Sequence, residues 1–150
     1  MEHTFTHLVT HVVFGTKGRA PTITTEMKSP LHAYLGGIIK EVGGKPLIIN
    51  GTHDHVHLLV ALPATVAIAD LIRVVKANSS RWAHEKWPKR HEFGWQQGYG
   101  AFSVSRSAMK DVEEYIANQE EHHRKVSFQE EFLALLKRHD IPYDERYIWE

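Results

Sequence analysis

The stretch LIINGTHDHVHLLVAL, residues 47–62, decides the fold, because it contains two short strands separated by a turn. The first strand is expected over residues 47–50, and the Gly51-Thr52 pair is typical of a turn. The second strand is expected over residues 55–62, where an apolar run ends before a proline. The elements on either side indicate which fold these two strands belong to.

One helix and one strand are predicted on each side of this pair of strands. On the N-terminal side, residues 5–14 are rich in β-branched and aromatic side chains and predict a strand. The apolar spacing of residues 25–42 predicts a helix, whose first turn Pro30 is expected to split off. On the C-terminal side, residues 66–87 predict a long helix and residues 99–104 a strand. The order β-α-β-β-α-β indicates the α+β ferredoxin-like fold, an antiparallel sheet with helices on one face.

Two additional helices are expected after the last strand. Ser105 or Ser107 is a typical N-cap for a helix over about residues 107–125, called the tyrosine helix below. A C-terminal helix is expected over about residues 127–139, with a serine at its start. Because the chain shows no linker and no repeat, it is expected to form a single domain, 1–150.

Composition limits the classes of protein that fit. The 18 basic and 18 acidic residues give a formal net charge of zero, which argues against a protein that coats duplex DNA broadly. The absence of cysteine excludes disulfides and thiolate metal ligands and suits a reducing cytoplasm. Residues 1–10 mix acidic and histidine side chains into an apolar segment, unlike a signal peptide, and the longest apolar run, residues 58–62, is too short to span a membrane. A cytoplasmic protein without membrane contact is therefore expected.

Histidine is the most unusual feature of the composition, with 12 residues, and two of them define a candidate metal site. Side chains alternate along a strand, so His55 and His57 are expected to project side by side while Val56 faces the opposite side. Two imidazoles on a rigid strand form half of a metal site, which His53 is expected to join or to flank in the preceding turn. The competing interpretation is a pair of solvent-exposed histidines.

The tyrosine helix carries a second candidate pair. Tyr115 and Gln119 are four residues apart and are therefore expected on one face of the helix. Gln119 offers a carbonyl oxygen as a third ligand, and Tyr115 offers a hydroxyl beside the metal. The competing interpretation is a half-buried core tyrosine with a surface glutamine. His122 and His123 are expected to be helix-end cations or surface groups.

Taken jointly, these motifs resemble those of the HUH single-tyrosine transposases of the insertion-sequence 200/605 family. The resemblance covers nearly the whole chain, and it implies a bacterial or archaeal protein that acts at the nucleoid. It is carried by HVVFGTK at 11–17, DHVHLLV at 54–60, KANSSR at 76–81, WQQGYGAFSVS at 95–105, YIANQEEHH at 115–123 and YIW at 147–149.

The resemblance implies a reaction and the residues that carry it out. His55 and His57 match the histidine pair of the HUH motif, and Gln119 matches the third protein ligand of Mg²⁺ or Mn²⁺. Tyr115 matches the nucleophile. The family cuts and rejoins single-stranded DNA, folded into imperfect hairpins at the ends of insertion sequences, through a 5′-phosphotyrosine intermediate. It acts as a homodimer, in which the tyrosine helix of one protomer can serve the metal site of the other.

A local DNA-binding surface is expected in spite of the zero net charge. Residues 73–90 contain six basic residues and one acidic residue, whereas residues 111–150 contain five basic and eleven acidic ones. Trp95, Tyr99 and Phe102 are candidates for stacking on unpaired bases, with core packing as the alternative. The candidate phosphate contacts lie on the long helix, in the first loop and at the start of the tyrosine helix: Lys17, Arg19, Arg73, Lys76, Ser80, Arg81, Arg106 and Lys110.

Three other functions stay open from the sequence. A hydrolase that uses water as its nucleophile would hold zinc with His53, His55 and His57, and it would not need Tyr115. A catalytically inactive module would bind single-stranded or hairpin DNA without cutting it. A replication initiator or relaxase would share the histidine pair, although such chains are usually larger.

Overall fold

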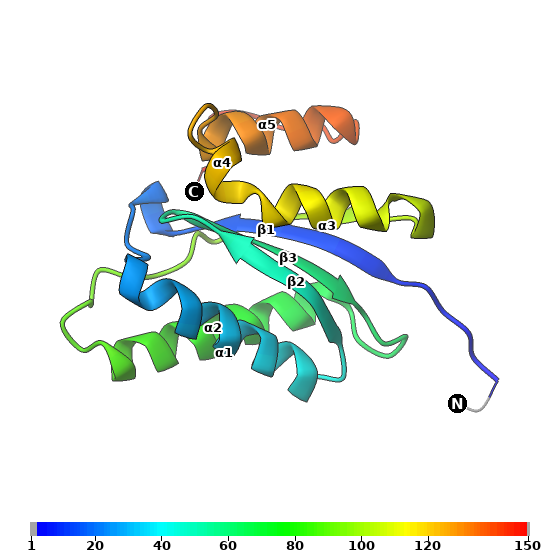
Figure 1. Ribbon diagram of the computed structural model, residues 1–150, viewed down its shortest axis with the longest axis horizontal. Coiled ribbons are helices and arrows are strands. Elements are labelled where there is room, and N and C mark those ends of the chain that lie inside the picture. The colour runs from blue at the N-terminus through cyan, green and yellow to red at the C-terminus, as the bar shows by residue number, and fades with distance from the viewer. Residues whose placement is uncertain (1–2, 150) are drawn as a thin grey trace.

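The computed structural model describes residues 3–149 and has a four-stranded antiparallel sheet at its centre (Figure 1). The strand order is β2-β3-β1-β4, so that β1 and β3 lie in the middle. This topology confirms the predicted α+β ferredoxin-like fold with its β-α-β-β-α-β order of elements. The strands are β1 (Val9–Gly15), β2 (Lys45–Gly51), β3 (His55–Ala61) and β4 (Gly100–Ser103).

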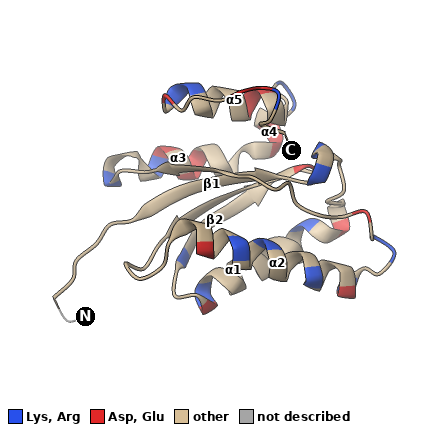
Figure 2. Cartoon of the chain, turned by 180° about the vertical axis from the view of Figure 1, so that it is seen from behind, with Lys and Arg blue, Asp and Glu red and all other residues tan. Residues whose placement is uncertain are grey.

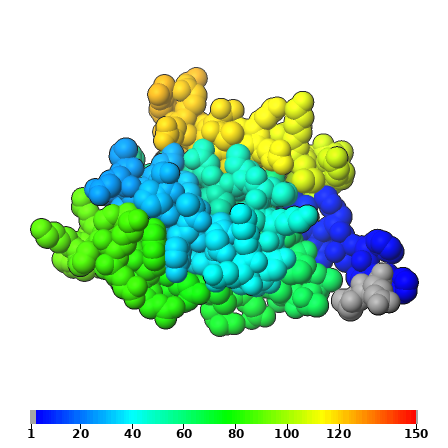
Figure 3. Space-filling view, turned by 60° about the horizontal axis from the view of Figure 1, so that its bottom comes forward, coloured from blue at the N-terminus to red at the C-terminus, as the bar shows by residue number. Residues whose placement is uncertain are grey.

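Two helices cover one face of the sheet. Helix α1 (Thr25–Glu41) and helix α2 (Ile68–Lys86) lie side by side on this face (Figure 1, Figure 3). Neither of them, nor any other helix within residues 3–149, is long and apolar enough to cross a membrane. The larger part of the core lies between these helices and the sheet and includes Val12, Phe14, Leu31, Leu35, Val56, Leu58, Leu71 and Val75.

The C-terminal part of the chain covers the opposite face of the sheet (Figure 1). Strand side chains alternate, so Val12 and Val56 pack toward α1 and α2, whereas Val13 packs against the C-terminal helix on the other face. The predicted metal ligands of β3 lie on this second face. Its helices are the 3-10 helix η2 (Arg106–Ala108), α3 (Met109–Ala117), α4 (Gln119–His122) and α5 (Phe128–Arg138).

Two boundaries on the N-terminal side differ from the prediction. The first strand begins at Val9 rather than at residue 5, and Phe5 is 91% exposed. Pro30 lies within α1 without splitting it, contrary to expectation. Its missing N–H removes only the helical hydrogen bond to the carbonyl of Glu26, a residue of the exposed first turn. Buried side chains on either side of Pro30 hold the helix against the sheet, the side chain of Thr24 caps its first turn, and Gly43, with a positive φ, follows its end.

The tyrosine helix is broken, and the prediction of one continuous helix over residues 107–125 is wrong. Helix α3 ends at Asn118, after which α4 makes a single turn. The cause lies on the sheet, because the Asn50 side chain amide of β2 donates to the carbonyls of Ile116 and Ala117 at 2.9 and 3.1 Å. Those carbonyls would otherwise accept the next two N–H groups of the helix.

The start of the tyrosine helix differs from the prediction as well. The side chain of Ser105 contacts that of Ser107 and caps no helix. The C-terminal helix, by contrast, begins as expected at Ser127, whose hydroxyl accepts from the backbone N–H of Glu130. Glu130 reaches back to the Ser127 backbone N–H, which completes a capping box and fixes the first turn of α5.

Candidate metal centre and tyrosine

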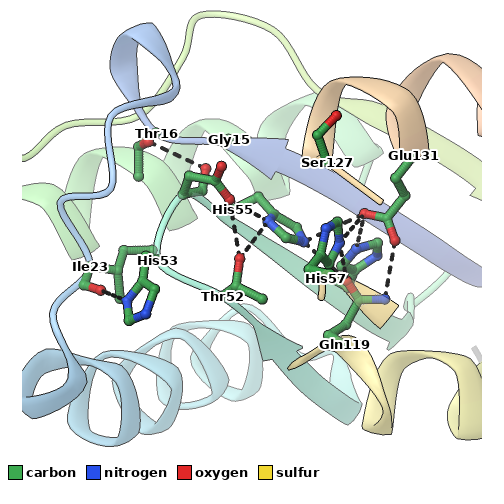
Figure 4. Close-up of polar contacts among 12 residues, drawn as sticks. Gly15, Thr16, Ile23, Thr52, His53, His55, His57, Gln119, Ser127 and Glu131 are labelled. Atoms are coloured by element: carbon green, nitrogen blue, oxygen red, sulfur yellow. Dashed lines mark hydrogen bonds and ion pairs between the residues drawn. The ribbon is translucent and has the colours of Figure 1, made fainter. Parts of the chain in front are cut away.

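The two predicted histidines of β3 lie side by side in the interior of the protein (Figure 4). His55 and His57 are both fully buried beneath the C-terminal helices, and their ring centroids are 5.1 Å apart. Val56 faces the opposite side of the sheet, as the alternation of the strand predicts. The competing interpretation of an exposed pair is therefore wrong.

Both histidines present the same ring nitrogen to the site. The Nδ1 atom of His55 lies 2.8 Å from the carboxylate of Asp54 and 3.1 Å from the hydroxyl of Thr52. The Nδ1 atom of His57 lies 2.7 Å from Nε2 of the buried His11 on β1. Because these contacts fix the rings through Nδ1, both Nε2 atoms point into the space between the sheet and the helices.

The broken helix places Gln119 at these two nitrogens. Its side chain is fully buried, and its Oε1 atom lies 3.0 Å from Nε2 of His55. The same oxygen lies 3.0 Å from Nε2 of His123, which follows α4. The side chain of His123 is only 9% exposed, so the expectation of a surface group is wrong, whereas its place at the C-terminal end of α4 agrees with the expectation of a helix-end group. The turn after Asn118 brings His123 back over the sheet.

Glu131 of α5 completes the group, and it is not among the ligands predicted from the sequence. Its Oε1 atom lies 2.9 Å from Nε2 of His57, 3.0 Å from Nε2 of His123 and 3.5 Å from Nε2 of His55. A signal was present, because Glu131 is the one acid in the buried stripe of α5. The other members of that stripe are apolar: Phe128, Phe132, Leu135 and Leu136.

Aromatic packing sets the position of α5. The ring of Phe128 stacks on that of His55, with centroids 4.6 Å apart and planes inclined by 13°. Gly15 makes room for this ring, because a Cβ atom at that position would lie 2.6 Å from Cε2 of Phe128. The docking of α5 thus depends on a residue of β1 that has no side chain.

Tyr115 lies at the edge of the group. Its hydroxyl donates a hydrogen bond to Oε2 of Glu131, and its ring centroid is 5.8 Å from that of His57. The residue is half-buried and lines a cleft of about 230 Å³ together with His122, Glu131 and Arg138. The side chain of His122 is 32% exposed and lies 3.3 Å from Glu131, so it flanks the site from the solvent side.

The group is held together by electrostatics. Burial opposes the ionisation of Glu131, but hydrogen bonds from His123 and His57 outweigh it and hold the pKa of Glu131 well below its usual value. Burial lowers the pKa of His57 to about 4, so its imidazole is neutral at pH 7. Burial and the bonded carboxylate of Glu131 raise the pKa of Tyr115 far above its usual value. The free phenol is therefore a weak nucleophile in this setting.

The residues of this group fit a divalent cation. Donor atoms of His55, His57, His123 and Glu131 all lie within 4.8 Å of one another. Imidazole nitrogens and a carboxylate oxygen are ligands that Mn²⁺ and other divalent transition metals accept, and carboxylate and amide oxygens suit Mg²⁺. His53 does not join them, because its exposed ring contacts the carbonyl of Ile23 at 2.9 Å. The zinc site proposed for a hydrolase therefore loses one of its three ligands.

The candidate DNA contacts do not form one patch. Lys and Arg residues are distributed over α1, α2, α3 and α5 (Figure 2). Lys76 is engaged internally, since its ammonium donates to the carbonyls of Gln96, Gln97 and Gly98 at 2.6 to 3.2 Å. Arg19, in the 3-10 helix η1 (Lys17–Arg19), lies over the ring of Trp149 at 4.9 Å.

The other candidate contacts are more accessible. Arg73 and Ser80 line a cleft of about 440 Å³ along α2 together with Trp95 and Tyr99. Phe102 is buried in the core beneath α5, so it does not offer its ring to a base. Among the candidate phosphate contacts, the charged side chains that are exposed are those of Lys17, Arg73, Arg81, Arg106 and Lys110.

A ferredoxin-like sheet therefore carries a buried group of histidines, with a tyrosine hydroxyl at its edge. The family model described as "Transposase IS200 like" matches residues 4–119. The chain belongs to this family of IS200-like transposases. Membership places it among enzymes that act on DNA by cutting and transferring strands.

Individual relatives agree with this assignment. The ISDra2 transposase TnpA of Deinococcus radiodurans is 26% identical over 114 residues, which cover 73% of this chain and 81% of that protein. A crystal structure from the same organism aligns with a TM-score of 0.64 at 24% identity, over 78% of this chain and 94% of that one. The REP-associated tyrosine transposase bound to a REP hairpin aligns with a TM-score of 0.61 at 13% identity, over 84% and 76%. Both structures share the fold of this chain.

Proposed function

We propose that this protein cuts and rejoins single-stranded DNA with the help of a divalent metal, through a 5′-phosphotyrosine intermediate on Tyr115. One observation carries the proposal: the Tyr115 hydroxyl, the Nε2 atoms of His55 and His57 and the side-chain NH₂ group of Gln119 converge on one carboxylate, that of Glu131. A nucleophile and a cation site are thus within reach of the same phosphate group.

The chemistry follows from the groups present. Mg²⁺ or Mn²⁺, when bound, polarises the scissile phosphate and neutralises its charge. Tyr115 attacks the phosphorus, its oxygen forms a new P–O bond, and the bond to the 3′ oxygen breaks. The hydroxyl proton of Tyr115 leaves as the bond forms, and the departing 3′ oxygen is protonated. Because the phosphotyrosine bond replaces the phosphodiester bond, a 3′-hydroxyl can later reverse the step without another energy source.

The proposed substrate is single-stranded DNA with hairpins at the ends of an insertion sequence. The hairpin bound by the REP-associated relative, whose fold this chain shares, supports it. Arg106 and Lys110 lie exposed at the start of the segment that carries Tyr115, where phosphate contacts would position a strand. These contacts and those of the cleft along α2 stay predictions.

A covalent adduct is the expected product of the reaction. A pool of labelled single-stranded oligonucleotides, with hairpins and randomised flanks, is incubated with the protein and Mn²⁺. We expect a band that survives denaturing electrophoresis, disappears with a chelator and is absent with the fully duplex pool. Mass spectrometry should find the nucleotide on the tryptic peptide of residues 111–124, which contains Tyr115 as its one tyrosine.

Two other outcomes of this assay would each refute the proposal. Cleavage that leaves a free 5′-phosphate and no adduct would indicate a hydrolase that uses water. Binding of the hairpins without cleavage of any sequence in the pool would indicate an inactive DNA-binding module.

We further propose that Tyr115 attacks at the metal site of its own chain, even if the protein forms the homodimer expected from its family. The contact between Tyr115 and Glu131 and the packing of its ring beside His57 and His11 support this arrangement. In an exchange between protomers, all of these contacts would have to come from the partner.

A mixing experiment distinguishes attack within one chain from attack across a dimer. Tyr115→Phe lacks the nucleophile, and His57→Ala lacks a ligand, so each variant alone should be inactive. We expect the mixture, after unfolding and joint refolding, to form no more adduct than the two variants separately. In an equal mixture half of the dimers are mixed and each of these has one complete site, so recovery of about a quarter of the wild-type yield would show that the tyrosine serves the partner's site.

A further inference from the structure

We propose that the chain supplies two further metal ligands after the segment matched by the family, Glu131 and His123, and that Glu131 also positions the Tyr115 hydroxyl beside the metal. The match to the family model ends at residue 119, so both residues lie in the C-terminal part of this chain. The role given to Tyr115 rests on the proposed function, whereas the ligand role can be tested without DNA.

The spacing of the donor atoms fits one coordination sphere. Ligands about 2.1 Å from a cation and at right angles to each other are about 3.0 Å apart. The observed neighbours lie at 3.0 Å (His55 to Gln119), 3.0 Å (Gln119 to His123), 3.0 Å (His123 to Glu131) and 2.9 Å (Glu131 to His57). Each of these five donor atoms therefore lies at the spacing of adjacent ligands from at least one other.

The surroundings of Glu131 argue for a cation rather than for a purely structural ion pair. A buried carboxylate costs several kcal/mol unless it is well paired, and Glu131 is 2% exposed within an apolar stripe. Three imidazole nitrogens converge on its single Oε1 atom within 3.5 Å. One carboxylate oxygen has about two lone-pair positions, so three N–H donors crowd it. A shared cation would remove this crowding. Each imidazole would then offer the lone pair of its Nε2 atom to the cation rather than an N–H group to the carboxylate.

The second oxygen of Glu131 faces the nucleophile. Oε2 accepts from the Tyr115 hydroxyl and from the Gln119 side chain amide at 3.2 Å. One carboxylate thereby reaches the metal ligands with one oxygen and the tyrosine with the other. Glu131 is a positioning residue toward Tyr115, because it fixes the hydroxyl at a set place relative to the cation.

Binding of Mn²⁺ to the DNA-free protein tests the ligand role. By calorimetry, we expect Glu131→Gln to weaken Mn²⁺ binding at least about 100-fold, because the loss of a direct ligand should cost more than the 10- to 100-fold typical of an outer-shell partner. Glu130→Gln is the matched control, because this neighbouring acid is exposed and glutamine keeps the capping box. Tyr115→Phe removes only an outer-shell hydrogen bond to Glu131, so it should weaken Mn²⁺ binding less than Glu131→Gln does.

Spectroscopy gives a second readout that does not depend on the free energy of unfolding. Electron spin echo modulation of bound Mn²⁺ should report three imidazole nitrogens in the wild type and two in His123→Gln. Unchanged Mn²⁺ affinity in Glu131→Gln, or two nitrogens in both proteins, would overturn the inference. A protein that binds Mn²⁺ through these residues but forms no DNA adduct would refute the proposed function and leave the ligand assignment in place.

Discussion

A Tyr115→Phe variant is expected to form no covalent adduct with single-stranded DNA and to cut it at least roughly 10⁴-fold more slowly than the wild type, by analogy with the loss of other enzymatic nucleophiles. The substitution removes one oxygen and keeps the half-buried ring beside His57 and His11. The reaction then lacks its attacking atom, while the metal ligands stay in place. Hairpin binding should change little, because phosphate and base contacts come from elsewhere on the chain.

The measurement compares single-turnover cleavage and adduct yield at saturating Mn²⁺. Tyr34→Phe is the matched control, because Tyr34 stacks on Trp82 on the opposite face of the sheet and should be dispensable. If Tyr115→Phe cuts as fast as Tyr34→Phe, then another group is the nucleophile. That outcome would support a hydrolase that uses water as its nucleophile.

A His57→Ala variant is expected to bind Mn²⁺ at least about 100-fold more weakly and to lose cleavage with it, because the loss of a direct ligand should cost more than that of an outer-shell partner. His57 offers Nε2 to the site while Nδ1 contacts His11. Its removal leaves Glu131 without one of its closest partners in a buried place. The melting temperature should therefore fall as well.

His53→Ala is the control for this experiment. His53 lies two residues before His55 but is exposed and outside the metal-ligand group. We expect it to keep the Mn²⁺ affinity and the cleavage rate of the wild type. A large loss of affinity in His53→Ala as well as in His57→Ala would contradict the assigned ligand set and support the alternative zinc site.

Local patterns were sufficient to predict the framework of the molecule. The order of the elements and the faces of β3 follow from the spacing of apolar residues, since strand alternation alone places His55 and His57 together. The N-cap serine of the last helix, Ser127, is likewise a local signal, and it was predicted correctly. These features depend on neighbours within a few residues.

The rest of the site depends on contacts that no local pattern contains. Asn50 ends α3 from a strand more than 60 residues earlier in the chain, so the break before Gln119 was not predictable from the helix itself. Glu131 meets His57 across 74 residues, and His11 meets it across 46. His123 seemed a helix-end residue because the predicted helix was continuous. Glu131, an acid in the apolar stripe of α5, was the one sequence signal for this part of the site.

The missing side chain at Gly15 can be used to classify the relatives of this protein. A relative with any larger residue there could not seat an aromatic ring where Phe128 lies, because a Cβ atom would already be 2.6 Å from it. Its last helix would have to shift, and an acid in the position of Glu131 would no longer reach the histidines. Glycine at this place and glutamate on the last helix should therefore be gained or lost together during evolution.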